Sequence, residues 1–128
     1  MKILSVVFGG FIGAITRYGI GEWIPTSNSF PLGTLLINLL GCFFLGWFLT
    51  LIIIRKKIRT EYTLFIGTGL IGSFTTFSTF SVETILLLQN GFLLNGALYI
   101  LTSILFGLLL AYLGVKLAMT SGEKGETH

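Results

Sequence analysis

Charged residues are scarce in this chain: 10% of its 128 residues are charged and 53% are hydrophobic, and the mean hydropathy is +0.92. This composition lies outside the usual range of soluble globular domains, which makes a water-soluble protein a poor interpretation. No segment between the hydrophobic runs is long enough to hold a separate soluble domain. The scarcity of charge therefore indicates a membrane protein of one domain.

Cysteine and histidine are almost absent as well. Cys42 is the single cysteine, so an intrachain disulfide is excluded, and the single histidine is His128. The sequence has no spacing typical of metal-ligand side chains. It also has no pattern that pairs a nucleophilic side chain with a base. We expect that the chain is not an enzyme.

Four apolar runs fill most of the sequence, at about 3–23, 31–54, 62–88 and 94–118. Each is long enough to cross a hydrocarbon core of ~30 Å as a helix. The first run follows Lys2, but it is too long for a secretory signal and no small-residue cleavage site follows it. We expect an all-α membrane protein with a single four-helix transmembrane domain over 1–119 and a disordered tail over 120–128.

The basic residues lie mostly on one side of these runs. If all four runs cross the membrane, seven of the eight basic residues share the side of both termini: Lys2, Arg55, Lys56, Lys57, Arg59, Lys116 and Lys124. Only Arg17 lies toward the other side. The positive-inside rule then places both termini in the cytoplasm. The net charge of +3 does not indicate nucleic acid as a partner, because the basic residues flank apolar spans and have no soluble face.

Polar side chains inside apolar runs are costly and are therefore informative. In the second run Thr34, Asn38 and Gly41 lie on one helical face. A buried asparagine amide offers two N–H donors. Two interpretations stay open for Asn38: a hydrogen bond that only holds two helices together, or a donor that lines a path for an anion.

The third run is the least ordinary, because between Gly67 and Ser81 it carries glycines and hydroxyls where a membrane anchor would carry aliphatic residues. Helix propensity is poor along this stretch, and broken backbone at membrane depth is tolerated only where it is buried in protein or lines a cavity. We expect the helix to be interrupted within this stretch. The carbonyl oxygens exposed by such a break would suit a cation.

Two phenylalanines follow the predicted break. Phe77 and Phe80 are three residues apart and share a face, with Thr76 and Thr79 on a neighbouring face. The positive edge of an aromatic ring can contact a small anion. The alternative is ordinary helix packing, in which the rings are core residues. Glu83, further on, is either an interfacial carboxylate or part of a water-filled vestibule.

The first and fourth runs add less. Residues 9–14 form a small-residue face that suits close helix approach. Arg17 either extends its charge to the lipid headgroups or anchors an oligomer through a hydrogen bond. In the fourth run, Tyr99 and Ser103 are four residues apart and would share a face.

With these features the chain resembles the Fluc or CrcB family of fluoride channels. The resemblance rests on Gly-Gly-x-x-Gly-Ala-x-x-Arg at Gly9–Arg17, Gly-Thr-Leu-x-x-Asn-x-x-Gly at Gly33–Gly41 and Thr-Thr-Phe-Ser-Thr-Phe-Ser-x-Glu at Thr75–Glu83. It implies two small subunits packed antiparallel in a bacterial cell membrane, fluoride passing through two pores at their interface, and a buried central sodium ion.

The resemblance also implies roles for individual residues. Sodium would be held by the backbone carbonyls of Gly72 and Thr75, and the resemblance implies that two half-helices of the third span meet there, at Gly72–Thr75. The fluoride pathway would include Asn38, Phe77, Phe80, Thr79, Tyr99, Ser103 and Glu83. Arg17, Thr34 and Thr76 would serve the interface or the structure around it.

Some positions depart from the family pattern. Ser73 stands where the family usually has a second glycine at the break, and Gly107 and Ala111 stand where many relatives carry hydroxyls. The basic residues also lie on one side, whereas single-gene members of the family have a weak charge bias. The second subunit is therefore either an inverted copy of this chain or a paired homologous chain of opposite orientation.

The function that the sequence favours is passive, selective export of fluoride, which lowers its cytoplasmic concentration. One alternative is a small four-helix proton-coupled multidrug transporter. Such a protein needs a carboxylate deep in the first span, where the only acidic residue, Glu22, lies at the very end. A second alternative is a structural subunit of a membrane complex, which would explain the small residues but not the pattern of phenylalanines and hydroxyls.

Overall fold

The computed structural model describes residues 1–24, 30–55 and 57–126, with the side chains of 122–126 outside the description. Within this part, four helical segments are long and apolar enough to cross a membrane: Lys2–Trp23, Leu32–Arg55, Thr60–Gln89 and Leu93–Ser121. The expected all-α membrane architecture is confirmed.

Three of the segments are single helices, and the third is assembled from pieces. The single helices are α1 (Lys2–Trp23), α2 (Leu32–Arg55) and α6 (Leu93–Glu126). The third segment consists of α3 (Thr60–Thr63), the π-helix η1 (Leu64–Ile71), α4 (Gly72–Phe74) and α5 (Ser78–Gln89).

The end of α6 differs from the tail expected at 120–128. The backbone stays helical through 120–126, and residues 127–128 lie outside the described part. The hydroxyl of Thr120 donates to the carbonyl of Lys116 at 2.9 Å, a bond within the helix that carries α6 past the predicted end of the fourth run at residue 118.

The interruption of the third helix is confirmed, but it begins later than expected. Thr75 is extended, with φ −80° and ψ 158°, and helix resumes at Ser78. Gly72 keeps helical angles, with φ −61° and ψ −38°. The Ser73 hydroxyl donates to the carbonyls of Gly10 at 2.8 Å and Leu70 at 3.3 Å, and so holds this turn against α1.

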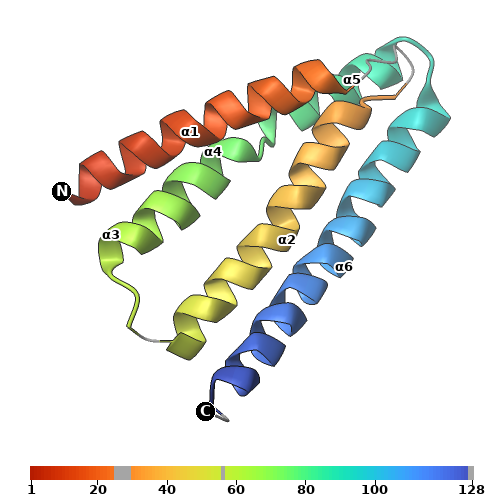
Figure 1. Ribbon diagram of the computed structural model, residues 1–128. Coiled ribbons are helices and arrows are strands. Elements are labelled where there is room, and N and C mark those ends of the chain that lie inside the picture. The colour runs from red at the N-terminus through yellow and green to blue at the C-terminus, as the bar shows by residue number, and fades with distance from the viewer. Residues whose placement is uncertain (25–29, 56, 127–128) are drawn as a thin grey trace.

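The helices form two pairs, as Figure 1 shows. α1 lies along η1 and α4, and α2 lies along α6. The pairs come together near α5 and splay apart toward the end of the molecule where both chain termini lie. The break in the third helix therefore lies where the two pairs approach each other.

Glycines allow the first pair to touch at the backbone. A Cβ atom on Gly9 would collide with the carbonyl of Phe65, and one on Gly13 would collide with the carbonyl of Leu70 and the hydroxyl of Ser73. Close approach of this kind is the main source of helix association in lipid, where apolar side chains gain little by leaving the bilayer.

The second pair is also packed through small residues. Gly46 of α2 lies against the backbone of Ala111, and Gly114 of α6 lies against the carbonyl of Phe43. A Cβ on Gly107 would be 3.4 Å from the sulfur of Cys42. Gly107 and Ala111, where the hydroxyl pattern is interrupted, thus lie at the contact between α2 and α6.

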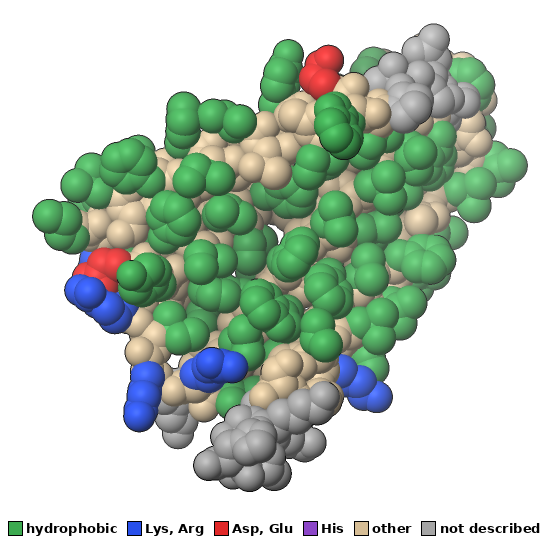
Figure 2. Space-filling view, viewed as in Figure 1, with side chains coloured by type: hydrophobic (Ala, Val, Ile, Leu, Met, Phe, Trp, Pro, Cys, Tyr) green, Lys and Arg blue, Asp and Glu red, His purple; other side chains and the backbone are tan. Residues whose placement is uncertain are grey.

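The outer surface agrees with a lipid environment. Hydrophobic side chains cover most of the face in Figure 2, and the Lys and Arg side chains visible there gather at the splayed end. Large apolar residues such as Phe11, Leu108 and Ile53 are 65–71% exposed, which water would penalise and lipid would not.

The glycine contact between α1 and the third helix can be tested with a matched pair of variants. Gly13→Val should lower the free energy of unfolding by about 1–3 kcal/mol or more, because backbone atoms of the neighbouring helix cannot move aside for the side chain. Gly10→Val is the control, since a Cβ there has no atom within 4 Å. Unfolding of the purified protein in detergent measures both, and equal losses in the two variants would contradict the contact.

Candidate functional site

The broken backbone is held by the side-chain amide of Asn38. The Nδ2 of Asn38 donates to the carbonyl of Thr76 at 2.9 Å, and the backbone N–H of Thr76 donates to Oδ1 of Asn38 at 2.8 Å. The amide thus pairs with both backbone polar groups of one residue, Thr76, as a neighbouring strand would, and it satisfies both groups at membrane depth. Of the two interpretations of Asn38, the interhelical hydrogen bond is present in the structure.

Two backbone N–H groups near the break, those of Thr76 and Thr79, donate to side-chain oxygens and not to helical carbonyls. In an unbroken helix the N–H of Thr76 would bond to the carbonyl of Gly72, and the N–H of Thr79 to that of Thr75. Here Asn38 accepts the first N–H, and the Thr76 hydroxyl accepts the second at 3.2 Å. The carbonyls of Gly72 and Thr75 therefore lose the partners that a continuous helix would supply.

The predicted polar face of α2 lies against this region. Gly41 is buried, and a Cβ on it would collide with the methyl group of Thr75. Thr34 donates its hydroxyl hydrogen to Oε1 of Glu83 at 2.5 Å. Thr34, Asn38 and Gly41, which their spacing places on one face of α2, thus all meet the third helix.

Four aromatic rings form a connected series beyond the break, which we call the ring series: Phe77, Phe80, Tyr99 and Phe30. Successive ring centroids are 5.9, 4.9 and 5.7 Å apart. The series begins at Phe77, which is 79% exposed, and passes through Tyr99, which is fully buried. These distances fall within the range for interacting aromatic pairs.

Phe30 was not among the residues expected at the site. It precedes the second apolar run directly, where an aromatic residue usually marks the membrane interface, so the sequence has no signal that distinguishes it from such a residue. The edge of one ring points at the face of the other in its contact with Tyr99, at an interplanar angle of 83°.

Two hydroxyls of α6 are buried without a hydrogen-bond partner among the described residues: Tyr99 Oη and Ser103 Oγ. They lie four residues apart and so on one side of the helix, as expected. An unsatisfied buried polar group costs about 1–3 kcal/mol, and such groups in native structures call for an explanation. Both hydroxyls can donate to a small anion.

Glu83 lines a cavity together with residues of α2 and the segment before it. The cavity has a volume of about 550 Å3, and its lining includes Thr34, Phe30, Glu83 and Asn90. The ring series therefore ends at the same cavity, because Phe30 belongs to both. Of the two interpretations of Glu83, this position favours the vestibule.

The remaining predicted residues are Thr76 and Thr79, which lie at the break, and Arg17, which lies on α1. The Thr76 hydroxyl donates to that of Thr79 at 3.2 Å, which joins both to the break. Arg17 is partly buried on α1, and within residues 1–24, 30–55 and 57–126 no hydrogen bond or ion pair joins it to the other site residues.

The described part of the chain has no group of three or more His, Cys, Asp or Glu side chains that could hold a metal ion. A cation at the break would therefore be bound by backbone or hydroxyl oxygens. Such hard oxygen donors suit alkali and alkaline-earth cations.

The sequence matches a known family over most of its length. The sequence model described as CrcB-like protein, Camphor Resistance (CrcB), matches residues 4–115. The fluoride-specific ion channel FluC of Oceanobacillus iheyensis is 53% identical over 118 residues, which is 92% of each chain. The fluoride-specific ion channel FluC of Methanocaldococcus jannaschii is 46% identical over 118 residues, covering 92% of this chain and 94% of the relative.

The amide pairing at the break makes a prediction about stability. Asn38→Leu keeps the approximate size of the side chain but leaves the N–H and the carbonyl of Thr76 without partners. We expect the free energy of unfolding to fall by about 2–6 kcal/mol, at about 1–3 kcal/mol for each unpaired group.

Thr50→Val is the control, because the hydroxyl of Thr50 donates only to the carbonyl of Gly46 in its own helix, at 2.7 Å. It should lower the free energy of unfolding by less than about 1 kcal/mol. Denaturation in detergent compares the two variants, and a loss in Asn38→Leu no greater than in the control would contradict the pairing.

Proposed function

The chain belongs to the CrcB-like protein family, and from this premise we propose that it is a fluoride-selective channel that exports fluoride passively and lowers its cytoplasmic concentration. The relatives named as fluoride-specific ion channels cover more than nine-tenths of the chain, so the proposal concerns the whole four-helix unit. Ion channels are not enzymes, and the site needs no catalytic group.

The observation that carries this proposal is the pair of unpartnered hydroxyls beside the ring series. Fluoride is small and strongly hydrated, so a pore must replace its water with donors that are already in place. Tyr99 and Ser103 offer two buried O–H donors: the Ser103 hydroxyl has no partner among the described residues, and the Tyr99 hydroxyl faces Thr34 and Glu83 without a hydrogen bond of ordinary length to either. The edges of Phe77 and Phe80 add weakly positive contacts that do not trap the ion as a full charge would.

The competing functions fit this arrangement less well. A proton-coupled transporter needs an acidic residue deep in the first span, and Glu22 is exposed at the end of α1. A purely structural subunit would explain the glycine contacts of α1, but it gives no role to buried hydroxyls without partners.

We propose that the carbonyls of Gly72 and Thr75 bind a structural sodium ion. Two features support this: both oxygens have lost their helical donors to Asn38 and Thr76, and oxygen ligands suit a hard cation. When bound, the ion supplies a fixed positive charge that raises the local potential for anions. Asn38 and Thr76 are the groups that keep these carbonyls available.

We also propose that a second subunit of opposite orientation completes the pore, either an inverted copy of this chain or a paired homologue. Phe77 is 79% exposed and Gly72 is exposed, so in a single chain the broken backbone at mid-span would face lipid, which does not tolerate unpaired backbone groups. A single set of four helices does not enclose an ion path, whereas a second subunit would cover this surface. The one-sided basic residues favour termini in the cytoplasm.

The proposed function is tested by loading proteoliposomes with fluoride or chloride and recording efflux with ion-selective electrodes. We expect the purified chain to release fluoride rapidly and to retain chloride. Efflux of fluoride by this chain alone would also exclude an obligatory distinct partner. Failure to release fluoride, with or without a homologous partner, would overturn the proposed function.

The same assay tests the rings. Phe77→Ile and Phe80→Ile should each abolish fluoride efflux while the protein stays folded, because isoleucine keeps an apolar side chain but has no polarised ring edge. Phe44→Ile is the control, since Phe44 is 46% exposed on α2 and lies outside the ring series. Wild-type efflux from both ring variants would remove the rings from the mechanism.

A substitution at Gly72 separates folding from assembly. A Cβ there would have Gly67 O as its nearest contact, at 3.7 Å, so Gly72→Val should leave the fold of the single chain intact. It should nevertheless prevent dimer formation, because the side chain would project at the proposed ion site and subunit contact.

Light scattering in detergent, with sodium present or absent, measures the oligomeric state. Gly19→Val is the control, since a Cβ on Gly19 has no atom within 4 Å. A Gly72→Val protein that is dimeric and active like the control would contradict both the ion site and the interface.

A further inference from the structure

A second cavity, separate from the ring series, lies at the splayed end of the molecule. It has a volume of about 750 Å3 and lies between the first turns of α1 and the start of the third helix. We call it the α1–α3 groove. Its volume is within the roughly 300–1,000 Å3 typical of sites for small organic molecules.

The walls of the α1–α3 groove are apolar. Leu4 and Phe8 line it from α1, and Tyr62, Phe65 and Ile66 line it from the third helix. Leu4, Phe8 and Tyr62 are 51–60% exposed, so these side chains are not packed against another part of the described chain. In a bilayer such a surface is in contact with hydrocarbon, and a groove between two helices can take one acyl chain.

The rim of the groove carries one basic side chain, Arg59. Its Nε lies 3.7 Å from Oε2 of Glu61, so the ion pair engages one edge of the guanidinium, and the side chain of Arg59 is 74% exposed. The backbone of Arg59 is fixed, because its carbonyl accepts the N–H groups of Tyr62 and Thr63, both at 3.1 Å.

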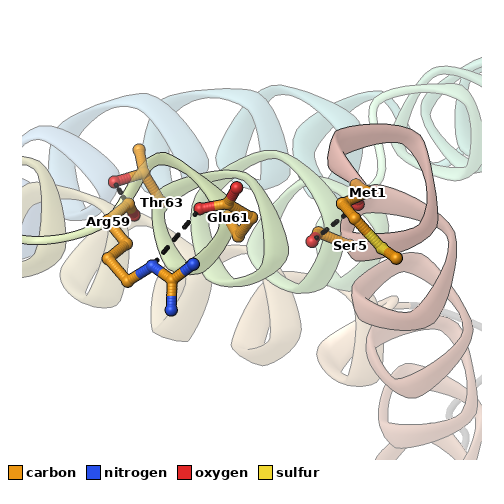
Figure 3. Close-up of polar contacts among 5 residues, drawn as sticks. All are labelled: Met1, Ser5, Arg59, Glu61 and Thr63. Atoms are coloured by element: carbon orange, nitrogen blue, oxygen red, sulfur yellow. Dashed lines mark hydrogen bonds and ion pairs between the residues drawn. The ribbon is translucent and has the colours of Figure 1, made fainter.

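Figure 3 shows how this rim is arranged. Glu61 lies on α3 and Arg59 directly before it, and Ser5 on α1 and Met1 directly before α1 lie across from them. The hydroxyl of Ser5 donates to the carbonyl of Met1 at 3.1 Å, so it is already engaged within α1. Arg59 is thus the group of the rim best suited to a further charged partner.

The surroundings of the rim are positive. Lys2, Arg55, Lys57 and Arg59 are exposed at this end, and Glu61 is the acidic residue that lines the groove. Figure 2 shows the clustering of Lys and Arg on this end. Basic pockets between helices at the cytoplasmic side of a membrane attract anionic headgroups.

We propose that the α1–α3 groove binds one anionic phospholipid, with an acyl chain against Leu4, Phe8 and Phe65 and the phosphate on the guanidinium of Arg59. Arginine matches a phosphate with two parallel N–H donors, and Glu61 holds the opposite edge of the group in position. A zwitterionic lipid brings the same phosphate, but its ammonium group is repelled by the basic surroundings. The lipid would tie the first helix to the third.

The test is a titration of the full-length protein in detergent with phosphatidylglycerol and, separately, phosphatidylethanolamine, with bound lipid counted by native mass spectrometry. We expect the wild type to retain phosphatidylglycerol preferentially. Arg59→Gln should weaken that binding roughly fivefold, since a basic residue at a membrane surface contributes about 1 kcal/mol to anionic-lipid binding.

Lys116→Gln is the matched control, because it removes one positive charge from α6, where Lys116 lies over the ring of Tyr112 at 5.1 Å and outside the groove. It should bind phosphatidylglycerol like the wild type. Leu4→Trp keeps every charge but fills the groove from an exposed position, and it should weaken binding of phosphatidylglycerol even if Arg59→Gln does not fold.

Other outcomes would overturn the proposal. Equal retention of the two lipids by the wild type, or equal losses in Arg59→Gln and Lys116→Gln, would mean nonspecific contact with surrounding lipid. Displacement of the lipid by inorganic phosphate would mean a site for a free anion. No bound lipid on the dimer would mean that a second subunit covers the groove.

Discussion

The pairing of the Asn38 side-chain amide with the backbone N–H and carbonyl of Thr76 is the interaction on which the rest of the structure depends. Backbone N–H and carbonyl groups have no water to bond at membrane depth, so a helix can be interrupted there only if another group takes over their hydrogen bonds. Asn38 does this with both ends of its amide, at 2.9 and 2.8 Å. Without that pairing the N–H and carbonyl of Thr76 would have no partners, and a continuous third helix would be favoured because it satisfies both groups.

The interruption changes what the neighbouring groups can do. It releases the carbonyls of Gly72 and Thr75 from helical hydrogen bonding, and it brings Phe77 to the surface while Phe80 packs on the buried Tyr99. The break therefore frees carbonyl oxygens, which suit a hard cation, and exposes an aromatic ring nearby, whose edge suits a small anion. These are the groups that the proposed sodium and fluoride sites would use.

The close glycine contacts have a complementary role. They lock α1 onto η1 and α2 onto α6, which leaves the region between the two pairs as the place where backbone can depart from a helix. Rigid packing on both sides lets a short interrupted segment keep one conformation. At the splayed end, α1 and the start of the third helix leave the α1–α3 groove between them, which is the proposed site of the phospholipid.

The local patterns of the sequence determined much of this protein. Four runs of sufficient length required four spans, and helical spacing placed Thr34 and Asn38 on one face and Tyr99 and Ser103 on another, because these relations depend only on the period of a helix. The expectation of a break followed from poor helix propensity together with the shortage of aliphatic residues.

Other features were decided only by the tertiary structure. Which group Asn38 bonds to depended on what lay opposite it, and that group, Thr76, is 38 residues away. The helix continues to Phe74, with the Ser73 hydroxyl bonded to α1, and Phe30 joins the ring series because the packing of α2 and α6 brings it to Tyr99. Spacing along one helix carries no information on such contacts, since they depend on how separate helices pack.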